Sequence, residues 1–154
     1  MMDIYIEFRE LLKSLNAHNA NYAVCGGFAV AFHGYVRATM DIDLLVQKND
    51  LDLLVAIAKK CGFEPCDDFL RFGIGTIRET TIKRLNKFVG TDFLTLDLIL
   101  VNSQTEIAWA TRLSVMLPDQ DMLVVSLDGL AAMKRLAGRT QDLLDLEKLG
   151  LDKS

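Results

Sequence analysis

Residues 26–46 read GGFAVAFHGYVRATMDIDLLV, and the rest of the chain is arranged around this stretch. It joins a glycine pair, Gly26 and Gly27, to two acids, Asp41 and Asp43, across thirteen intervening residues. The apolar residues around the acids favour a β-strand, and because strand side chains alternate, both carboxylates point to one face. Two unit charges about 4 Å apart repel by roughly 4 kcal/mol at an effective dielectric of about 20. We therefore expect a ligand from outside the strand to neutralise them.

A divalent cation suits this pattern of acids. Mg²⁺ binds one or two carboxylates and completes its shell with water and substrate phosphates. A third acid, Asp97, lies in a second apolar run, LTLDLILV, where Leu96 and Leu98 point to the opposite face. Three acids on strands that otherwise require burial predict a metal site formed by Asp41, Asp43 and Asp97.

The glycine pair predicts a phosphate site in the same region. Glycine allows the backbone to approach a ligand closely, and the N-terminus of a following helix presents free N–H groups to an anion. We expect a strand over 22–25 and a helix over 28–33 that Gly34 ends. His33 is interpreted as a helix-end histidine that is satisfied locally.

Together, the glycine pair, the DxD sequence and the third strand aspartate resemble the pattern of the nucleotidyltransferase superfamily related to DNA polymerase beta. The resemblance implies an α/β (α+β) fold in which a small mixed, twisted sheet is backed by helices. It also implies one nucleotidyltransferase-like domain over residues 1–154, with two short helices at its C-terminal end.

The same resemblance implies an activity. A nucleoside monophosphate would move from an NTP to an acceptor hydroxyl, with release of pyrophosphate and with Mg²⁺ as the cofactor. Asp41 and Asp43 would hold one ion at the triphosphate, and a second ion could lower the pKa of the acceptor. Asp97 would complete that second metal site or take the acceptor proton. Gly26 and Gly27 would cradle the triphosphate.

The C-terminal segment AAMKRLAGRTQDLLDLEKL, residues 131–149, is similar to the closing element of the branch associated with abortive-infection toxins and antitoxins. In this resemblance Lys134 would contact the nucleotide phosphates, and Asp142 would orient or relay near the reacting groups. Arg139 would hold phosphate or pair with an acid. Asp142 also has a structural interpretation, because negative charge is favourable near a helix N-terminus.

Two further candidates precede the first acid pair. Arg37 and Thr39 lie in the segment that leads to Asp41, where they either contact phosphate and support the acids, or are a solvated arginine and a turn threonine.

The stretch 68–87 is the most basic part of the chain and favours a twisted hairpin. Its charges form either a solvated face or a contact for the acceptor or triphosphate.

Composition limits the class of protein. The 154 residues are 51% hydrophobic and 25% charged, which is typical of one globular domain. The net charge of −4 argues against a general attraction to nucleic acid. No apolar run is long enough to span a membrane and the N-terminus does not resemble a signal peptide, so we expect a cytoplasmic protein. Three cysteines form no paired disulfide framework.

Periodicity and capping residues predict the remaining elements. We expect helices over about 3–19, 50–60, 103–112 and 127–137, with Asn49 or Asp50 capping the second and Ile107 inward in the third. A last helix is expected from Thr140, which would cap it, and an antiparallel edge pair from 114–117 and 122–125.

The sequence leaves the acceptor open, since no segment indicates base or acceptor recognition. The acceptor could be a small molecule, a protein or an RNA end, and a homodimer or a partner protein could complete its pocket. The alternative to an enzyme is a non-catalytic nucleotide-binding or antitoxin-like module with the same fold.

Overall fold

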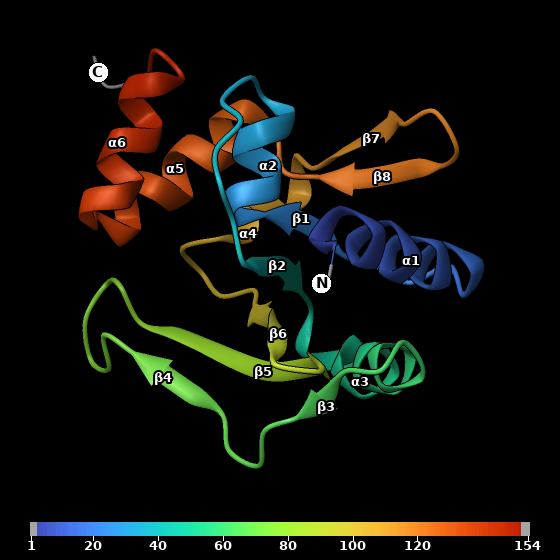
Figure 1. Ribbon diagram of the computed structural model, residues 1–154. Helices are drawn as coiled ribbons and strands as arrows, with labels where there is room; N and C mark the ends of the chain where they lie inside the picture. Colours follow the sequence, from blue (N-terminus) through green and yellow to red (C-terminus); the bar gives the residue numbers. More distant parts are fainter. Residues whose placement is uncertain (1–2, 152–154) are drawn as a thin grey trace.

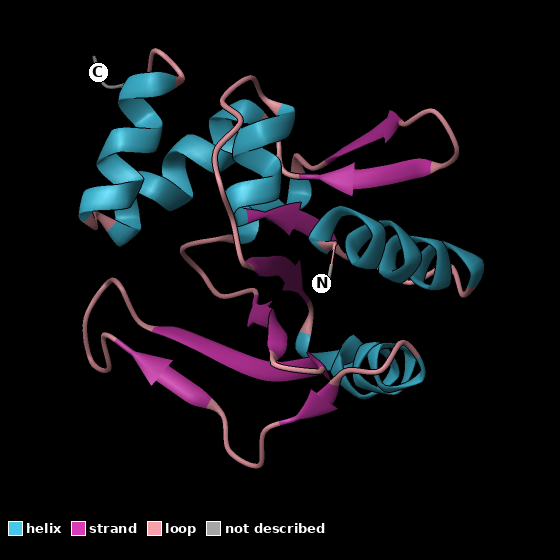
Figure 2. Cartoon of the chain, in the orientation of Figure 1, coloured by secondary structure: helices cyan, strands magenta, loops and turns pink. Residues whose placement is uncertain are grey.

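A mixed eight-stranded sheet runs through the molecule in the order β3-β5-β6-β2-β1-β8-β7, and β4 pairs with β5 (Figures 1 and 2). The computed structural model describes residues 3–151. The pairs β2–β6 and β1–β8 are parallel and the other pairs are antiparallel. The strands are β1 (Ala23–Cys25), β2 (Asp41–Val46), β3 (Glu64–Pro65), β4 (Leu70–Phe72), β5 (Thr80–Val89), β6 (Asp92–Leu100), β7 (Leu113–Met116) and β8 (Asp121–Val124).

Helices cover this sheet, so the predicted α/β fold with a mixed sheet and two short C-terminal helices is confirmed. In the view of Figure 1, α5 and α6 lie toward the left of the molecule, and α1 and α3 lie toward the right. The helices are α1 (Ile4–Ala17), α2 (Gly26–Phe32), α3 (Leu51–Lys60), α4 (Glu106–Ala110), α5 (Leu127–Ala137) and α6 (Thr140–Lys148), with a 3₁₀ turn, η1 (Lys48–Asp50), before α3.

Helical spacing determines which face of α1 is buried. Asp3 caps the helix by accepting a hydrogen bond from the backbone N–H of Tyr5 at 2.9 Å. Phe8, Leu11 and Leu15 then fall on one stripe and are buried against the strands. Each such side chain contributes about 1.5–3 kcal/mol when it leaves water. This packing places the apolar face of α1 in the core that also contains Val24 of β1 and Leu44 of β2.

The helix after β1 starts earlier than the sequence predicts. It begins at Gly26, directly after Cys25, so the glycine pair forms its first turn rather than a loop before it. Gly26 has a φ of +62°, a left-handed conformation that glycine adopts without strain. His33 is not satisfied locally, because its Nε2 lies 2.8 Å from the carbonyl oxygen of Val125 in a distant segment.

Three further predictions need correction. The helix expected over 103–112 spans only Glu106–Ala110, and its Ile107 is 77% exposed while Ala108 is buried. Asp50 is the N-cap of α3 but makes no capping hydrogen bond with its side chain. The N-cap of α6 is Arg139, and Thr140 is the first residue of that helix.

The hairpin and edge predictions are confirmed. Strands β4 and β5 pair antiparallel within the basic stretch, and β7 pairs antiparallel with β8 at the end of the sheet. Ser126 caps α5, and Gly138, at φ +63°, ends it. Among residues 3–151, no helix has both the length and the apolar character that crossing a bilayer requires.

Candidate functional site

Strand register brings the predicted acids together. Asp43 on β2 pairs with Asp97 on β6, and Asp97 pairs in turn with Arg84 on β5. Directly paired residues share a face of the sheet, so these three side chains form one row. Asp41 stands two residues before Asp43 on the same strand and therefore on the same face. Positions 41, 43 and 97 therefore lie on one face of the sheet, and their role as joint metal ligands stays a prediction.

The two acids of β2 have no direct partner. Among residues 3–151, neither the Asp41 nor the Asp43 carboxylate takes part in a hydrogen bond or an ion pair. Burial, followed by the charges of Asp97 and Asp41, raises the pKa of Asp43 to about 7, although Lys134 and Arg139 oppose this shift. Burial and Asp97 also raise the pKa of the exposed Asp41, against the effect of Arg84. A cation bound between them would remove this repulsion.

The third acid is paired. Arg84 donates from Nε to one oxygen of Asp97 at 2.8 Å and from Nη2 to the other at 3.0 Å. This bidentate geometry is the strongest arrangement of a guanidinium with a carboxylate. The hydrogen bond to Asp97 raises the pKa of Arg84, so this cation remains charged.

The glycine pair lies directly against the site. A methyl group at Gly26 would overlap the Asp43 carboxylate, and one at Gly27 would lie 2.8 Å from the Thr39 hydroxyl oxygen. Thr39 donates its hydroxyl to the backbone carbonyl of Asp41 at 3.2 Å. The absence of side chains at both glycines therefore lets the strand acids and the segment before them approach the backbone of α2.

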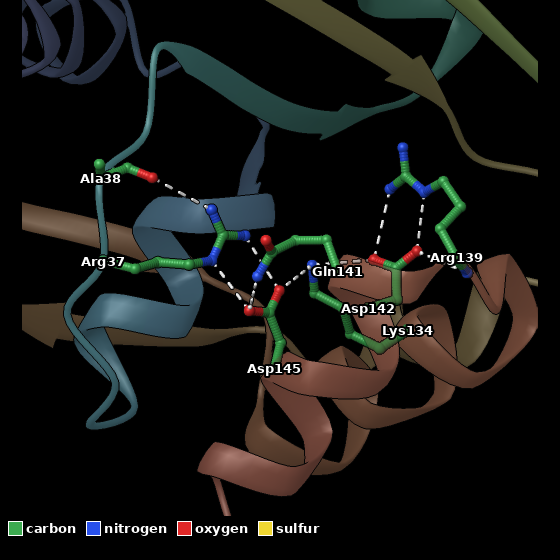
Figure 3. Close-up of polar contacts among 7 residues, drawn as sticks. All are labelled: Arg37, Ala38, Lys134, Arg139, Gln141, Asp142 and Asp145. Carbon is green, nitrogen blue, oxygen red and sulfur yellow. Dashed lines mark hydrogen bonds and ion pairs between the residues drawn. The ribbon is translucent and has the colours of Figure 1, made fainter.

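The C-terminal candidates form a separate network of ion pairs (Figure 3). The Lys134 ammonium lies 3.1 Å from Asp142 and 3.0 Å from Asp145. Arg139 donates to Asp142 at 2.7 Å, and Arg37 donates to both oxygens of Asp145 at 2.8 and 2.9 Å. The two aspartates and Lys134 are buried. Three cations thus share two carboxylates, and Arg37 ties the segment before β2 to α6.

Hydrogen bonds keep this network ionised. Burial acts to raise the pKa of Asp142, but hydrogen bonds from Arg139 and the charge of Lys134 outweigh it and lower that pKa. Burial is likewise outweighed at Asp145, where bonds from Arg37, Lys134 and Gln141 lower the pKa. Lys134 is engaged inside the protein, whereas the Arg139 side chain is 77% exposed and can reach a ligand.

The donor set at the acids fits one hard cation. Within the described part of the chain, no group of three or more His, Cys, Asp or Glu side chains is arranged to hold a metal ion. Asp41 and Asp43 nevertheless offer two carboxylates without direct partners on one strand. Two carboxylates suffice for Mg²⁺, because water and substrate phosphates supply its remaining ligands.

Sequence reasoning missed two residues of these networks. Arg84 is one of several cations in the basic stretch, and only the register of β5 on β6 shows that it is the one that lies opposite Asp97. Asp145 carries a weak signal, because it lies one helical turn after Asp142 and on the same face. Its partner Arg37 lies 108 residues away, which no local pattern could reveal.

Comparison with solved structures identifies similar folds. TM1012 from Thermotoga maritima, a candidate nucleotidyltransferase, has a TM-score of 0.63 at 13% identity, over 92% of this chain and 88% of that one. The lincosamide antibiotic adenylyltransferase LnuA, with lincomycin bound, has a TM-score of 0.56 at 12% identity, over 96% of both chains. ANT(2″)-Ia, in complex with adenylyl-2″-tobramycin, has a TM-score of 0.55 at 14% identity, over 92% of this chain and 91% of that one.

Sequence comparison adds no closer relative, because neither a protein-family model nor a curated protein sequence matches the chain. Identities of 12–14% to the solved structures bear on the fold alone. The arrangement of strands and helices is therefore similar to that of solved structures that include nucleotidyltransferases.

Proposed function

We propose that this protein is a Mg²⁺-dependent nucleotidyltransferase that moves a nucleoside monophosphate from an NTP to an acceptor hydroxyl and releases pyrophosphate. The observation that carries this proposal is the register that places Asp43 beside Asp97, with Asp41 on the same face. The contact of Asp43 with Gly26 adds a glycine backbone next to the acids, where a triphosphate could approach closely.

Each residue of the acid pair has a defined task in this proposal. Asp41 and Asp43 hold Mg²⁺, which when bound neutralises phosphate charge and stabilises the leaving pyrophosphate. Gly26 and Gly27 leave room for Asp43 and Thr39 against the backbone of α2, and the triphosphate lies beside these side chains. Phosphoryl transfer needs positioning and charge neutralisation more than covalent help from the protein, and these residues supply both.

The C-terminal network positions the site. Lys134 acts through Asp142 and Asp145 rather than by direct phosphate contact, because both acids already engage its ammonium group. Arg139 is the cation of this network with the most exposed side chain, so it is the candidate for holding phosphate. Arg37, through Asp145, and Thr39, through the carbonyl of Asp41, hold the start of β2.

The acceptor that we propose is a small molecule with a free hydroxyl. LnuA is a lincosamide antibiotic adenylyltransferase, and ANT(2″)-Ia binds adenylyl-2″-tobramycin, so two proteins of similar fold carry small molecules. The aligned regions cover 96% and 91% of those chains, which supports a small-molecule site within a fold of this size. A protein or RNA end, or a pocket completed by a second subunit, are the alternatives.

Transfer of a labelled α-phosphate tests the proposal. The protein is incubated with Mg²⁺ and each of the four NTPs in turn, with a small-molecule extract as the acceptor source, and products are separated by mass. We expect a labelled product with at least one NTP, and none with Asp43→Asn or without Mg²⁺. An absence of label with all four NTPs, although Mg²⁺ and NTP bind, would contradict the enzymatic assignment.

One observation favours a second candidate function, that of a non-catalytic nucleotide-binding module. The resemblance of the C-terminal segment to the antitoxin-associated branch is consistent with such a module. Arg84 engages both oxygens of Asp97, so the third acid is not free as it stands. The module predicts that Mg²⁺ with an NTP raises the thermal midpoint while no extract yields a labelled product. A protein that binds this chain in competition with NTP, when isolated from a whole-cell extract, would support this candidate.

A further inference from the structure

Asp43 on β2 and Asp97 on β6 form a row of acids, here called the acid row, and Arg84 continues this row onto β5. The register pairs Arg84 with Asp97 and Asp97 with Asp43, so a guanidinium and two carboxylates lie in line across three neighbouring strands. This order gives Asp97 a fixed cation on one side and an unpaired acid on the other. The row therefore already contains one positive group before any ion binds.

The hydrogen bonds commit Asp97 to this cation. Both carboxylate oxygens accept from Arg84, at 2.8 and 3.0 Å, and Asp97 is only 5% exposed. Asp41 and Asp43 have no such partner among residues 3–151. The three acids are therefore unequal: two are open to an ion from solution, and the third is neutralised by the protein itself.

The charges lead to the same conclusion. Three carboxylates and one guanidinium leave two negative charges, which a single divalent cation balances. A second divalent ion would have to displace Arg84 from a buried carboxylate and leave a net positive centre. Because Arg84 already satisfies both oxygens of Asp97, a second ion would have to compete with a complete bidentate pair.

We infer that Arg84 takes the place of a second metal ion, so that the site binds one divalent cation, at Asp41 and Asp43, and Asp97 is neither a metal ligand nor the base. The inference rests on the proposed function. Asp97 is then a positioning residue that fixes Arg84 in the row. Arg84 Nη1 makes no hydrogen bond within the described residues and its side chain is 38% exposed, so this nitrogen can face an oxygen of the substrate.

The stoichiometry of Mn²⁺ binding tests the inference. Mn²⁺ alone is titrated into the full chain and the free ion is followed by electron paramagnetic resonance. We expect one Mn²⁺ per chain for the wild type. We expect two for Arg84→Gln, because Asp97 loses its cation and becomes available to a second ion. Two ions bound to the wild type, or one ion bound to Arg84→Gln, would overturn the inference.

Two variants keep the test decisive if Arg84→Gln does not fold, which circular dichroism would reveal. The double variant Arg84→Gln/Asp97→Asn keeps the net charge of the row and is expected to bind one Mn²⁺ with an affinity within about twofold of the wild type, and loss of that ion would overturn the inference. Arg84→Lys keeps the charge and is expected to bind one. The control Arg9→Gln removes the exposed pair with Asp119 and should also bind one.

The outcomes separate this inference from the proposed function. A wild type that binds no Mn²⁺ contradicts the inference, while the proposed function is judged by label transfer with Mg²⁺ and NTP. A wild type that binds two ions, with label transfer observed, rejects the role of Arg84 and leaves the transferase assignment standing. One ion in the wild type and two in Arg84→Gln supports the inference whether or not an acceptor has been identified.

Discussion

Arg37 holds both carboxylate oxygens of Asp145, at 2.8 and 2.9 Å, although the two residues are 108 positions apart in the chain. The pair joins the segment that leads into β2 to the last helix. Figure 3 shows Asp145 between the Arg37 guanidinium and the Lys134 ammonium. The position of Asp41 therefore depends on a contact made by the C-terminal end of the fold.

Arg37→Ala should destabilise the protein by about 1–3 kcal/mol, because a buried carboxylate loses a bidentate partner. Urea unfolding measures this change. The matched control is Arg9→Ala, whose partner Asp119 is exposed, and an ion pair that is screened by solvent contributes little to stability. Equal losses for the two variants would show that burial of Asp145 adds nothing. We also expect slower label transfer for Arg37→Ala, since the segment before β2 is less well held.

Lys134→Met should be more damaging, by about 3–5 kcal/mol, because it leaves Asp142 and Asp145 buried without the cation that they share. Lys148→Met, on the exposed face of α6, should change the free energy of unfolding by less than about 0.5 kcal/mol. Unfolding in urea at constant pH compares the two. If Lys134→Met keeps wild-type stability but fails to bind NTP, direct phosphate contact by Lys134 would be the better explanation.

Gly26→Ala should remove metal-dependent stabilisation, because its methyl group would displace the Asp43 carboxylate. Gly90→Ala is the matched control: both glycines have a φ of +62°, but nothing lies within 4 Å of a methyl group at Gly90. Both variants carry the strain of a left-handed backbone, about 1–2 kcal/mol. The increase in thermal midpoint with Mg²⁺ and NTP should persist only in Gly90→Ala. The same increase in both variants would argue against this contact.

Asp43 should make stability depend on pH. Its pKa is raised to about 7 in the folded protein, by burial and by the charges of Asp97 and Asp41, against about 4 in the unfolded chain. Between these values the folded state holds a proton that the unfolded state has released. The contribution of Asp43 is therefore fully present below about pH 4 and is lost as the pH rises through about 7.

Asp43→Asn removes this titration, so its unfolding free energy should fall less steeply than that of the wild type between about pH 4 and pH 7, and it should exceed the wild-type value at the upper end. Denaturant unfolding at a series of pH values measures both slopes. Stabilisation of the wild type by Mg²⁺ should grow over the same range, because the ion binds the ionised carboxylate. Parallel slopes for the two proteins would rule out Asp43 as the titrating group.

The acid row was predictable in part because alternation along a strand is a local rule. Asp41 and Asp43 share a face for that reason, and the flanking leucines of Asp97 turn it toward one side. The sequence could not show which neighbour Asp97 would have. The pairing of β2 with β6 is parallel and distant in sequence, so periodicity could not reveal it.

Charge pairing was the least predictable property. Residues 71–87 contain several lysines and arginines that the sequence alone does not distinguish, yet the register places Arg84 opposite Asp97. Lys134, Arg139 and Asp142 were singled out for contacts with a nucleotide, and the structure places all three in one internal network, where those contacts remain predictions. A sequence shows which groups are charged, but burial and register decide which of them meet.

The short hairpin of β5 and β6 has a consequence for the order of folding. Arg84 and Asp97 lie on adjacent arms of it, 13 residues apart, so their contact can form on the microsecond timescale of hairpin closure. Asp43 reaches Asp97 only when β2 docks in parallel, which requires closing a much longer loop. We therefore expect the third acid to acquire its counter-ion before β2 docks, so that the folding chain does not bring three uncompensated negative charges together.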